Sequence, residues 1–259
     1  MNPIVSIITP SYNSADFIAE TIDSILAQSF TDWELLITDD CSTDNTREIV
    51  QSYAEKDERI KLFVLEKNSG AGVARNNSLT NAQGRYIAFC DSDDRWTPEK
   101  LEKQLAFMQE NDYAFTCTSY FTCNEAGEVN GVVKCLKRLS YARQTTDNKI
   151  GCLTAMYDTE KIGKVYFPLL RKRQDWGMTL LALKKCHAAY GIQEPLALYR
   201  VRTGSISSNK LSLIKYNMAV YEEALGWSKL HSSIYFAIVF MPTYVMKKIS
   251  QKIYNFKKK

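Results

Sequence analysis

The first half of the chain alternates between two hydrophobic patterns, and this alternation constrains the fold more than any other feature. Short apolar runs predict strands at residues 4–9, 33–38, 60–65 and 86–90. Between them, apolar side chains recur at the spacing of amphipathic helices. Strands that alternate with helices form a mostly parallel sheet with helices on both faces, because the crossovers are right-handed. The sequence therefore predicts the α/β class, with a mostly parallel central sheet flanked by helices.

The fourth predicted strand ends in three carboxylates, Asp91, Asp93 and Asp94. Open α/β sheets bind ligands at the C-terminal ends of their strands. Asp91 and Asp93 point the same way if the strand geometry continues, and their repulsion then favours a bound cation. Mg²⁺ and Mn²⁺ sites commonly combine a few carboxylates with substrate phosphates. The alternative is an acidic turn in which Asp94 caps a neighbouring element.

Two further loops are expected at the same edge of the sheet, at residues 9–14 and 39–44. Tyr12 can stack on a nucleobase, and Asp39 or Asp40 can accept hydrogen bonds from a base or a ribose. The alternatives are a packed loop aromatic for Tyr12 and turn or capping roles for the two aspartates.

A glycine-containing loop precedes the predicted helix over residues 73–82. Its glycines permit close approach of the backbone to a ligand, and Arg75 on the helix can reach a phosphate or a base. The loop lacks the G-x-G-x-x-G spacing, which argues against a dinucleotide dehydrogenase. Gly84 is predicted to end the helix in the left-handed conformation.

Composition excludes several classes of protein. The chain has 259 residues, of which 45% are hydrophobic, enough for a substantial core. Its seven cysteines include no C-x-x-C pair, so neither a disulfide framework nor a zinc site is indicated, and reduced cytosolic thiols are expected. Two histidines make a histidine-based triad improbable. No secretory signal is recognisable at the N-terminus, and we expect a cytoplasmic protein.

The charge is divided unequally along the chain. Residues 1–113 carry 10 Lys and Arg against 20 Asp and Glu, a net charge of −10, whereas residues 114–259 carry 23 against 9, a net charge of +14. The acidic half suits a metal site, and the basic half suits phosphates or an anionic membrane surface. Nucleic acid is not expected as a partner, because no nucleic-acid-binding motif accompanies the basic residues.

Four motifs, in order, make the chain resemble the family 2 glycosyltransferases with the GT-A fold. The motifs lie at residues 6–13 (SIITPSYN), 37–44 (ITDDCSTD), 68–76 (NSGAGVARN) and 89–96 (FCDSDDRW). The resemblance implies inverting transfer of a sugar from a nucleoside diphosphate, with a UDP-sugar as the favoured donor and Mn²⁺ or Mg²⁺ at the D-x-D motif. It also implies an acceptor that is a glycan or a lipid-linked sugar of a bacterial surface polysaccharide.

The resemblance also assigns residues to roles. Tyr12 and Asp40 are expected at the nucleoside, and Asp91 and Asp93 at the ribose and the metal, with Asp94 as a further metal candidate. The full expected donor-binding set is Pro10, Tyr12, Asp39, Asp40, Asn68, Gly70, Arg75, Asp91, Ser92 and Arg202.

Two motifs in the second half differ from the family pattern. Residues 173–176 are similar to the family's Glu-Asp motif, with Gln174 in place of glutamate. Inversion by direct displacement needs one general base, and Asp175 at the entrance of a predicted helix is the candidate; the alternative is a helix N-cap. Residues 199–207 resemble a segment that often has histidine where Arg202 stands, so Arg202 offers a cation to the diphosphate instead of a metal ligand.

The remaining sequence predicts three parts: a nucleotide-sugar-binding half at 1–113, an acceptor-binding half of the same domain at 114–205, and a helical, basic extension at 206–259. A strand at 114–122 and a hairpin turn at 124–128 are expected in the second part.

The C-terminal extension carries an apolar segment at 234–246 that is too short to span a bilayer. It is followed by six lysines, Lys247, Lys248, Lys252, Lys257, Lys258 and Lys259. This pattern is typical of attachment to the inner face of the cell membrane. The alternative is a helix that packs on the core.

Two other classes of function remain open at this stage. A nucleotidyltransferase shares the acidic metal site but usually has a glycine-rich loop with a lysine, which residues 10–13 do not supply. A catalytically silent sugar-nucleotide-binding module is disfavoured by the presence of Asp91, Asp93 and Asp175.

Overall fold

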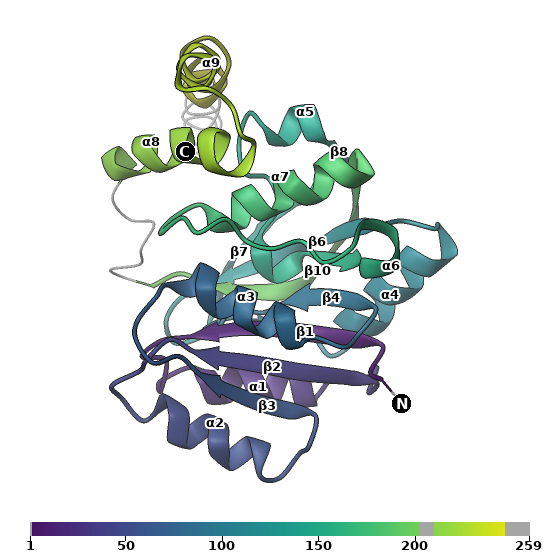
Figure 1. The fold of residues 1–259 in the computed structure, drawn as a ribbon. Helices are drawn as coiled ribbons and strands as arrows, with labels where there is room; N and C mark the ends of the chain where they lie inside the picture. The colour runs from purple at the N-terminus through teal and green to yellow at the C-terminus, as the bar shows by residue number, and fades with distance from the viewer. Residues whose placement is uncertain (1, 203–209, 247–259) are drawn as a thin grey trace.

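The computed structural model describes residues 2–202 and 210–246, which form one mixed sheet covered by helices on both faces (Figure 1). The strand order is β3-β2-β1-β4-β9-β6-β10-β5, with β7 beside β6 and β8 beside β10. The strands are β1 (Val5–Ser11), β2 (Trp33–Asp39), β3 (Ile60–Val64), β4 (Tyr86–Phe89), β5 (Arg95–Trp96), β6 (Phe115–Cys123), β7 (Val129–Val133), β8 (Arg138–Ser140), β9 (Met156–Asp158) and β10 (Ala188–Arg200). The helices are α1 (Ile18–Leu26), α2 (Thr46–Ala54), α3 (Ala71–Asn81), α4 (Lys100–Glu110), α5 (Tyr141–Gln144), α6 (Thr159–Ile162), α7 (Gln174–Cys186), α8 (Lys210–Ala219) and α9 (Lys229–Tyr235), with π-helical turns at Val220–Ala224 (η2) and Phe236–Phe240 (η3) and a 3₁₀ turn at Cys152–Thr154 (η1).

The first four strands in the sheet order, β3, β2, β1 and β4, are parallel, as the sequence predicts. Neighbouring residues on β1 face opposite layers of the core. Ile7 packs in the cluster that includes α1, α2 and α4, and Ile8 packs in the cluster that includes α3 and α7. Both faces of these strands are therefore covered, which explains their continuous apolar runs. Their parallel direction brings the loops after β1, β2 and β4 to one edge.

The second half of the sheet is mixed. Strand β9 lies antiparallel between β4 and β6, and the long strand β10 runs parallel to β6. The short strand β5, which directly follows the acidic loop, pairs antiparallel with β10. The predicted strand at 114–122 and the hairpin turn at 124–128 are both confirmed by β6 and β7. Strands from both halves of the chain therefore hold the acidic loop.

The prediction that Gly84 ends the helix in the left-handed conformation is wrong, although glycine is needed at this position for another reason. Helix α3 ends at Asn81, Ala82 is extended, and Gly84 is not among the glycines with positive φ. A Cβ at Gly84 would instead lie 2.6 Å from the backbone nitrogen of Ser6. Glycine is needed there because the chain passes close to β1, and the Gly84 N–H donates to the Ser6 hydroxyl at 2.8 Å.

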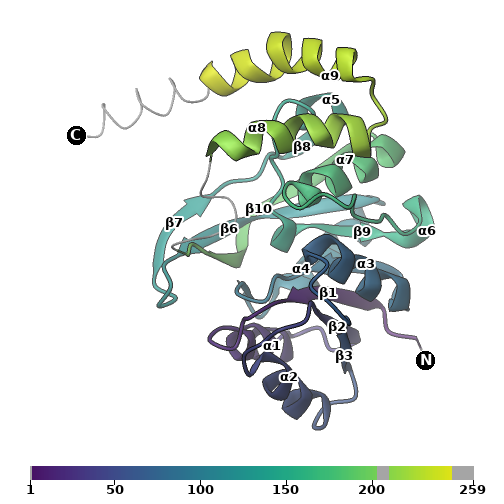
Figure 2. The ribbon, with the colours of Figure 1, turned by 60° about the vertical axis from the view of Figure 1, so that its left-hand side comes forward.

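The C-terminal helices pack on α7 with one face and leave the other exposed. Tyr221 and Phe240 are buried against Trp176. The exposed side chains form a stripe along α9, η3 and the helical residues up to 246, hereafter the apolar stripe: Leu230, Ile234, Ile238, Val245 and Met246. Figure 2 shows α8 and α9 stacked at the end of the molecule that also carries α5 and α7.

The core-packing alternative thus holds for one face of this segment. Within residues 2–202 and 210–246, no helix has the length and apolar character needed to cross a bilayer. The six lysines of the predicted membrane-binding tail lie outside the described residues. Residues 203–207 of the motif at 199–207 also lie outside them.

Candidate active site

A cavity of about 940 Å³ lies at the edge of the sheet where the predicted loops meet. One wall comes from the loops after β1, β2 and β4, from α3 and from the end of β10. The other wall comes from the segment after β7, from α5 and the residues that follow it, and from the segment that enters α7. The predicted residues that line this cavity are Pro10, Tyr12, Asp40, Arg75, Asp91, Ser92, Asp93, Asp94, Asp175 and Arg202.

The acidic loop presents two carboxylates to the cavity, each beside an arginine. Asp91 pairs with Arg75 at 2.5 Å between Oδ1 and Nη2, and Asp93 pairs with Arg202 at 3.2 Å between Oδ2 and Nη1. Both aspartates retain partial exposure, at 30% and 26% of their side chains. Burial, with repulsion from Asp91, raises the pKa of Asp93. The two carboxylates are therefore close enough to repel one another, as their spacing predicts.

Asp94 differs from its neighbours because its side chain is buried. Its Oδ1 accepts a hydrogen bond from the backbone N–H of Arg200 at 3.0 Å. Burial and the charges of Asp93 and Asp91 raise the pKa of Asp94 well above its usual range. Its backbone carbonyl accepts from the Thr21 hydroxyl at 2.8 Å. Asp94 thus anchors the acidic loop to α1 and β10.

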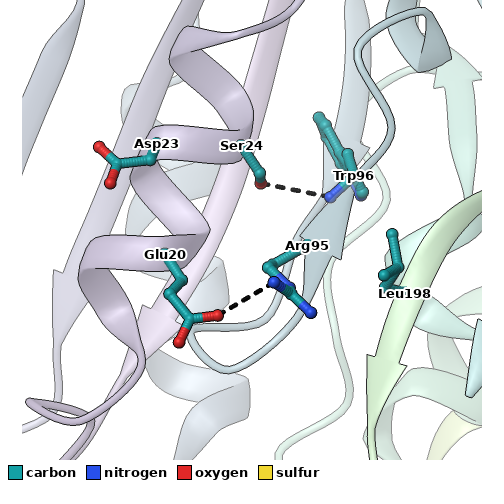
Figure 3. Close-up of a pocket in the computed structure, with 6 residues that line it drawn as sticks. All are labelled: Glu20, Asp23, Ser24, Arg95, Trp96 and Leu198. Atoms are coloured by element: carbon teal, nitrogen blue, oxygen red, sulfur yellow. Dashed lines mark hydrogen bonds and ion pairs between the residues drawn. The ribbon is translucent and has the colours of Figure 1, made fainter. Parts of the chain in front are cut away.

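Arg200 supports this loop from behind, and sequence reasoning did not single it out. Its buried guanidinium donates from Nε to the backbone carbonyl of Asp93 at 3.0 Å and from Nη2 to Glu20 at 2.7 Å. Glu20 also pairs with Arg95 at 3.2 Å, at the wall of a separate pocket of about 330 Å³ drawn in Figure 3. Glu20 and Arg200 are 180 positions apart, so no local pattern connects them.

The loops after β1 and β2 are held by the aspartates expected at the nucleoside. The Asp40 carboxylate accepts from the backbone N–H groups of Ser69 and Gly70 at 2.6 and 2.7 Å. Asp39 is fully buried and accepts from Arg47 Nε at 2.7 Å. Asp39, Asn68 and Gly70 do not line the cavity; Asn68 donates to the Asp40 carbonyl at 3.2 Å. Tyr12 stands at the cavity wall, half exposed.

Arg75 is a buried cation in the cavity wall. Its guanidinium lies 5.1 Å from the ring centroid of Phe167, and its Nε has no hydrogen-bond partner among the described residues. Burial opposes its charge, but Asp91 foremost among the surrounding acids raises the pKa of Arg75 nonetheless, and Asp175 contributes to the rise. Arg75 is therefore positively charged and interacts electrostatically with both Asp91 and Asp175.

Asp175 lies in the first turn of α7 and also lines the cavity. The N-cap of this helix is Arg173, which makes no side-chain capping bond, so the N-cap alternative for Asp175 is wrong. The Asn148 amide donates to Asp175 Oδ2 at 2.8 Å, and the Gln144 amide donates to Asn148 Oδ1 at 3.0 Å. This relay leaves Asp175 Oδ1 without a partner among the described residues. Asn148 and Gln144 were not identified from the sequence.

Gln174 occupies the position where the family pattern has glutamate. Its side chain is more than nine-tenths buried, and its Oε1 has no hydrogen-bond partner among the described residues. A Cβ at Gly72 would collide with this oxygen. The N-terminal turns of α3 and α7 are therefore in contact through Gly72 and the Gln174 amide.

Comparison with known proteins places this geometry in a family. Residues 6–161 match the family described as Glycosyl transferase family 2. The putative teichuronic acid biosynthesis glycosyltransferase TuaG of Bacillus subtilis is 49% identical over 222 residues, which cover 85% of this chain and 88% of that protein. The UDP-Glc:alpha-D-GlcNAc-diphosphoundecaprenol beta-1,3-glucosyltransferase WfgD of Escherichia coli is 38% identical, covering 82% of this chain and 83% of its own. The crystal structure of S. aureus TarS in complex with UDP aligns with a TM-score of 0.67 at 25% identity, over 90% of this chain and 68% of that one.

The chain therefore belongs to glycosyltransferase family 2 and has the GT-A fold. It is an inverting glycosyltransferase, which moves a sugar from a nucleoside diphosphate donor to a hydroxyl group. The nucleotidyltransferase and the silent binding module, which the sequence left open, are not favoured by these relatives.

Proposed function

We propose that this enzyme transfers a sugar from a UDP-sugar to a glycan or lipid-linked acceptor during assembly of a surface polysaccharide, at the cytoplasmic face of the membrane. The Escherichia coli relative is named for a UDP-Glc donor and a diphosphoundecaprenol-linked acceptor, and the Bacillus subtilis relative for teichuronic acid biosynthesis. Both relatives are similar along most of their length, which supports a shared substrate class.

The observation that carries this proposal is that one cavity collects carboxylates from two distant parts of the chain. Asp91 and Asp93 lie on the wall built by the strand ends, and Asp175 lies on the wall built by α7. In the proposed reaction, Asp175 takes the proton of the acceptor hydroxyl as that oxygen attacks the anomeric carbon. The bond from this carbon to the diphosphate oxygen breaks, and UDP leaves with the electron pair. Attack opposite the leaving group inverts the anomeric configuration.

Asp91 and Asp93 suit a divalent metal by the chemistry of their donor atoms. Among the described residues, no group of three or more Asp, Glu, His and Cys side chains forms a complete metal cluster. Mg²⁺ and Mn²⁺ need no such cluster, because they are commonly held by one or two carboxylates together with substrate phosphates and water. When bound, the ion would neutralise charge on the diphosphate. The arginines now paired with these aspartates, Arg75 and Arg202, would then be available to the phosphates.

The donor site that we propose keeps the sequence assignments for the residues that line the cavity and gives the others a supporting role. Tyr12, Pro10 and Asp40 belong to the wall that would hold the nucleoside, and Ser92 links two of its loops through a 2.7 Å contact with the Ser14 hydroxyl. Asp39, Asn68 and Gly70 would act by holding these loops in place. Residues 1–113 then serve mainly the donor, and residues 114–205 mainly the acceptor.

The apolar stripe supports attachment of the enzyme to a membrane. Leu230 and Ile238 are 72% and 69% exposed, and in the sequence six lysines follow the stripe. An apolar face beside basic residues binds anionic interfaces by burial and by electrostatic attraction together. The same face would bring the cavity to the leaflet in which lipid-linked acceptors reside.

The activity is tested by incubating the purified protein with individual UDP-sugars, Mn²⁺ and a lipid-diphosphate-linked sugar, and measuring release of UDP. Product NMR gives the anomeric configuration. We expect transfer with inversion; retention, or cleavage of the nucleotide without sugar transfer, would contradict the proposal.

Membrane attachment is tested by sedimentation with anionic vesicles. Ile238→Asn should reduce binding, and high salt should weaken it in part. Val132→Asn removes a comparably exposed apolar side chain on β7 and serves as the control, since Val132 is 51% exposed. Equal binding of both variants would contradict attachment through the stripe.

A further inference from the structure

The cavity wall around Asp175 carries a cluster of positive charges that the donor does not account for. The cations of this wall are Lys134, Arg143, Lys149, Arg171, Lys172 and Arg173, and they face only two carboxylates on the same wall, Asp147 and Asp175. They come from three segments: the chain after β7, α5 with the residues behind it, and the entry to α7. We call this set the acceptor-side cations.

Three of these cations are both exposed and unpaired. Lys134, Arg143 and Arg171 form no ion pair with any described residue. Lys149 lies 3.8 Å from Asp147, and Lys172 stands over the ring of Tyr216. A cluster of like charges repels itself, so several uncompensated cations around one cavity favour an anionic ligand.

The acceptor-side cations come from other segments of the chain than the two arginines proposed for the donor. Arg75 and Arg202 lie beside the D-x-D carboxylates, on the wall proposed for the nucleoside diphosphate. The acceptor-side cations share their wall with Asp175 instead. A second anion, bound close to the acceptor hydroxyl, would therefore have its own set of positive charges.

We propose that the acceptor-side cations bind a diphosphate that links the accepting sugar to a lipid; this rests on the function proposed above. In a sugar joined to a lipid by a diphosphate, the phosphates lie one sugar ring away from the accepting hydroxyl. With that hydroxyl at Asp175, the diphosphate would meet cations of the same segments, because Arg171 and Arg173 closely precede Asp175 and Lys149 adjoins Asn148, which donates to Asp175. Arginine suits this role because its planar fork matches phosphate oxygens.

The contact between the Arg143 segment and the apolar stripe also supports a lipid-linked ligand. Thr145, two residues after Arg143, contacts the Tyr235 hydroxyl at 2.6 Å, and its backbone carbonyl accepts from Tyr221 at 2.7 Å. Tyr235 is the last residue of α9, which begins the apolar stripe. The segment that carries Arg143 is therefore attached directly to the helix that would lie on the membrane, as Figure 2 shows for α5 and α9.

The test measures binding of decyl diphosphate, which contains the proposed group without any sugar. Titrations by calorimetry are made with saturating UDP and Mn²⁺, so that the donor site is filled. We expect Arg143→Gln and Arg171→Gln each to weaken decyl diphosphate binding about tenfold, the usual scale for a lost bond to a charged group. Arg138→Gln removes an exposed cation on β8 that does not line the cavity, and it should bind as the wild type does.

Three results would overturn the assignment. The variants could bind decyl diphosphate as tightly as the control does. Decyl glucuronide could bind as well as decyl diphosphate, in which case a uronic acid carboxylate is the anion. The variants could lose affinity for UDP instead, in which case the cations belong to the donor site.

The assay is also independent of the proposed activity. If UDP and Mn²⁺ fail to bind, the donor proposal fails, while the decyl diphosphate titration without UDP still decides whether these cations form a diphosphate site. Turnover by the Arg171→Gln variant offers a further check. The substitution should reduce turnover more with a diphosphate-linked acceptor than with an acceptor that carries a neutral aglycone.

Discussion

Lys100 is a buried cation without a carboxylate partner among the described residues, and its removal should change how stability depends on pH. Its side chain is fully buried on α4, where Nζ donates to Gln104 Oε1 at 2.8 Å and lies 3.9 Å from the ring centroid of Trp96. No carboxylate pairs with it among the described residues. Burial lowers the pKa of Lys100 from 10.5 to about 7.

The sign of the effect follows from this lowered pKa. Between about pH 7 and 10.5 the unfolded chain binds a proton at Lys100 that the folded chain does not, so the free energy of unfolding rises with pH in this window. The penalty is absent above the window and complete below it. Each pH unit corresponds to about 1.4 kcal/mol, and the whole window to roughly 5 kcal/mol as an upper limit.

Lys100→Met removes the penalty while keeping the volume of the side chain. We expect the stability gain of this variant, its free energy of unfolding minus that of the wild type, to be about 2 to 3 kcal/mol larger at pH 7 than at pH 9. The unpaired Gln104 oxygen costs about 1 to 3 kcal/mol at both pH values, so only the difference between them is diagnostic. Urea unfolding at the two pH values measures it, with Lys184→Met as a control on the exposed side of α7. The reasoning is refuted if Lys100→Met differs from the wild type by the same amount at both pH values.

Three further outcomes are expected. Asp175→Asn should leave UDP binding intact and lower turnover by about 10² or more, because the acceptor proton loses its base; normal turnover with the natural acceptor would remove Asp175 from this role. Asp93→Ala should abolish the Mn²⁺-dependent part of UDP binding measured by calorimetry, since the ion loses an anionic ligand, and an unchanged affinity would place the metal elsewhere. Gly84→Ala should lower the free energy of unfolding by about 1 to 3 kcal/mol, because its methyl group would press on the Ser6 backbone; a neutral variant would mean that β1 can shift.

The parts of the fold that local pattern determines could be predicted from the sequence. A strand such as 86–90 and the acidic loop after it can be recognised from a short run of neighbouring residues. The C-terminal ends of parallel strands then lie at the same edge of the sheet. The antiparallel insertion of β9, three residues long, has no comparable signal. The reason for Gly84 also could not be seen, because a close approach to Ser6 and a left-handed turn both require glycine.

The candidate site divides in the same way. Residues that face the ligand, such as Asp93 and Asp175, stand in recognisable motifs. Residues that hold them, such as Arg200 and Asn148, act through partners distant in the sequence, so neither spacing nor composition identifies them. The sequence therefore predicts the residues that face the ligand better than the residues that hold them in place.

The attachment of the acidic loop to the end of β10 determines when the site can form during synthesis. Asp94 and the backbone N–H of Arg200 that it accepts from are 106 positions apart. At a translation rate of roughly 5 to 20 residues per second, the loop waits about 5 to 20 s for this partner after its own synthesis. Until then its buried carboxylate has no anchor on β10. The nascent enzyme thus completes the attachment of its D-x-D loop only after Arg200 has been made.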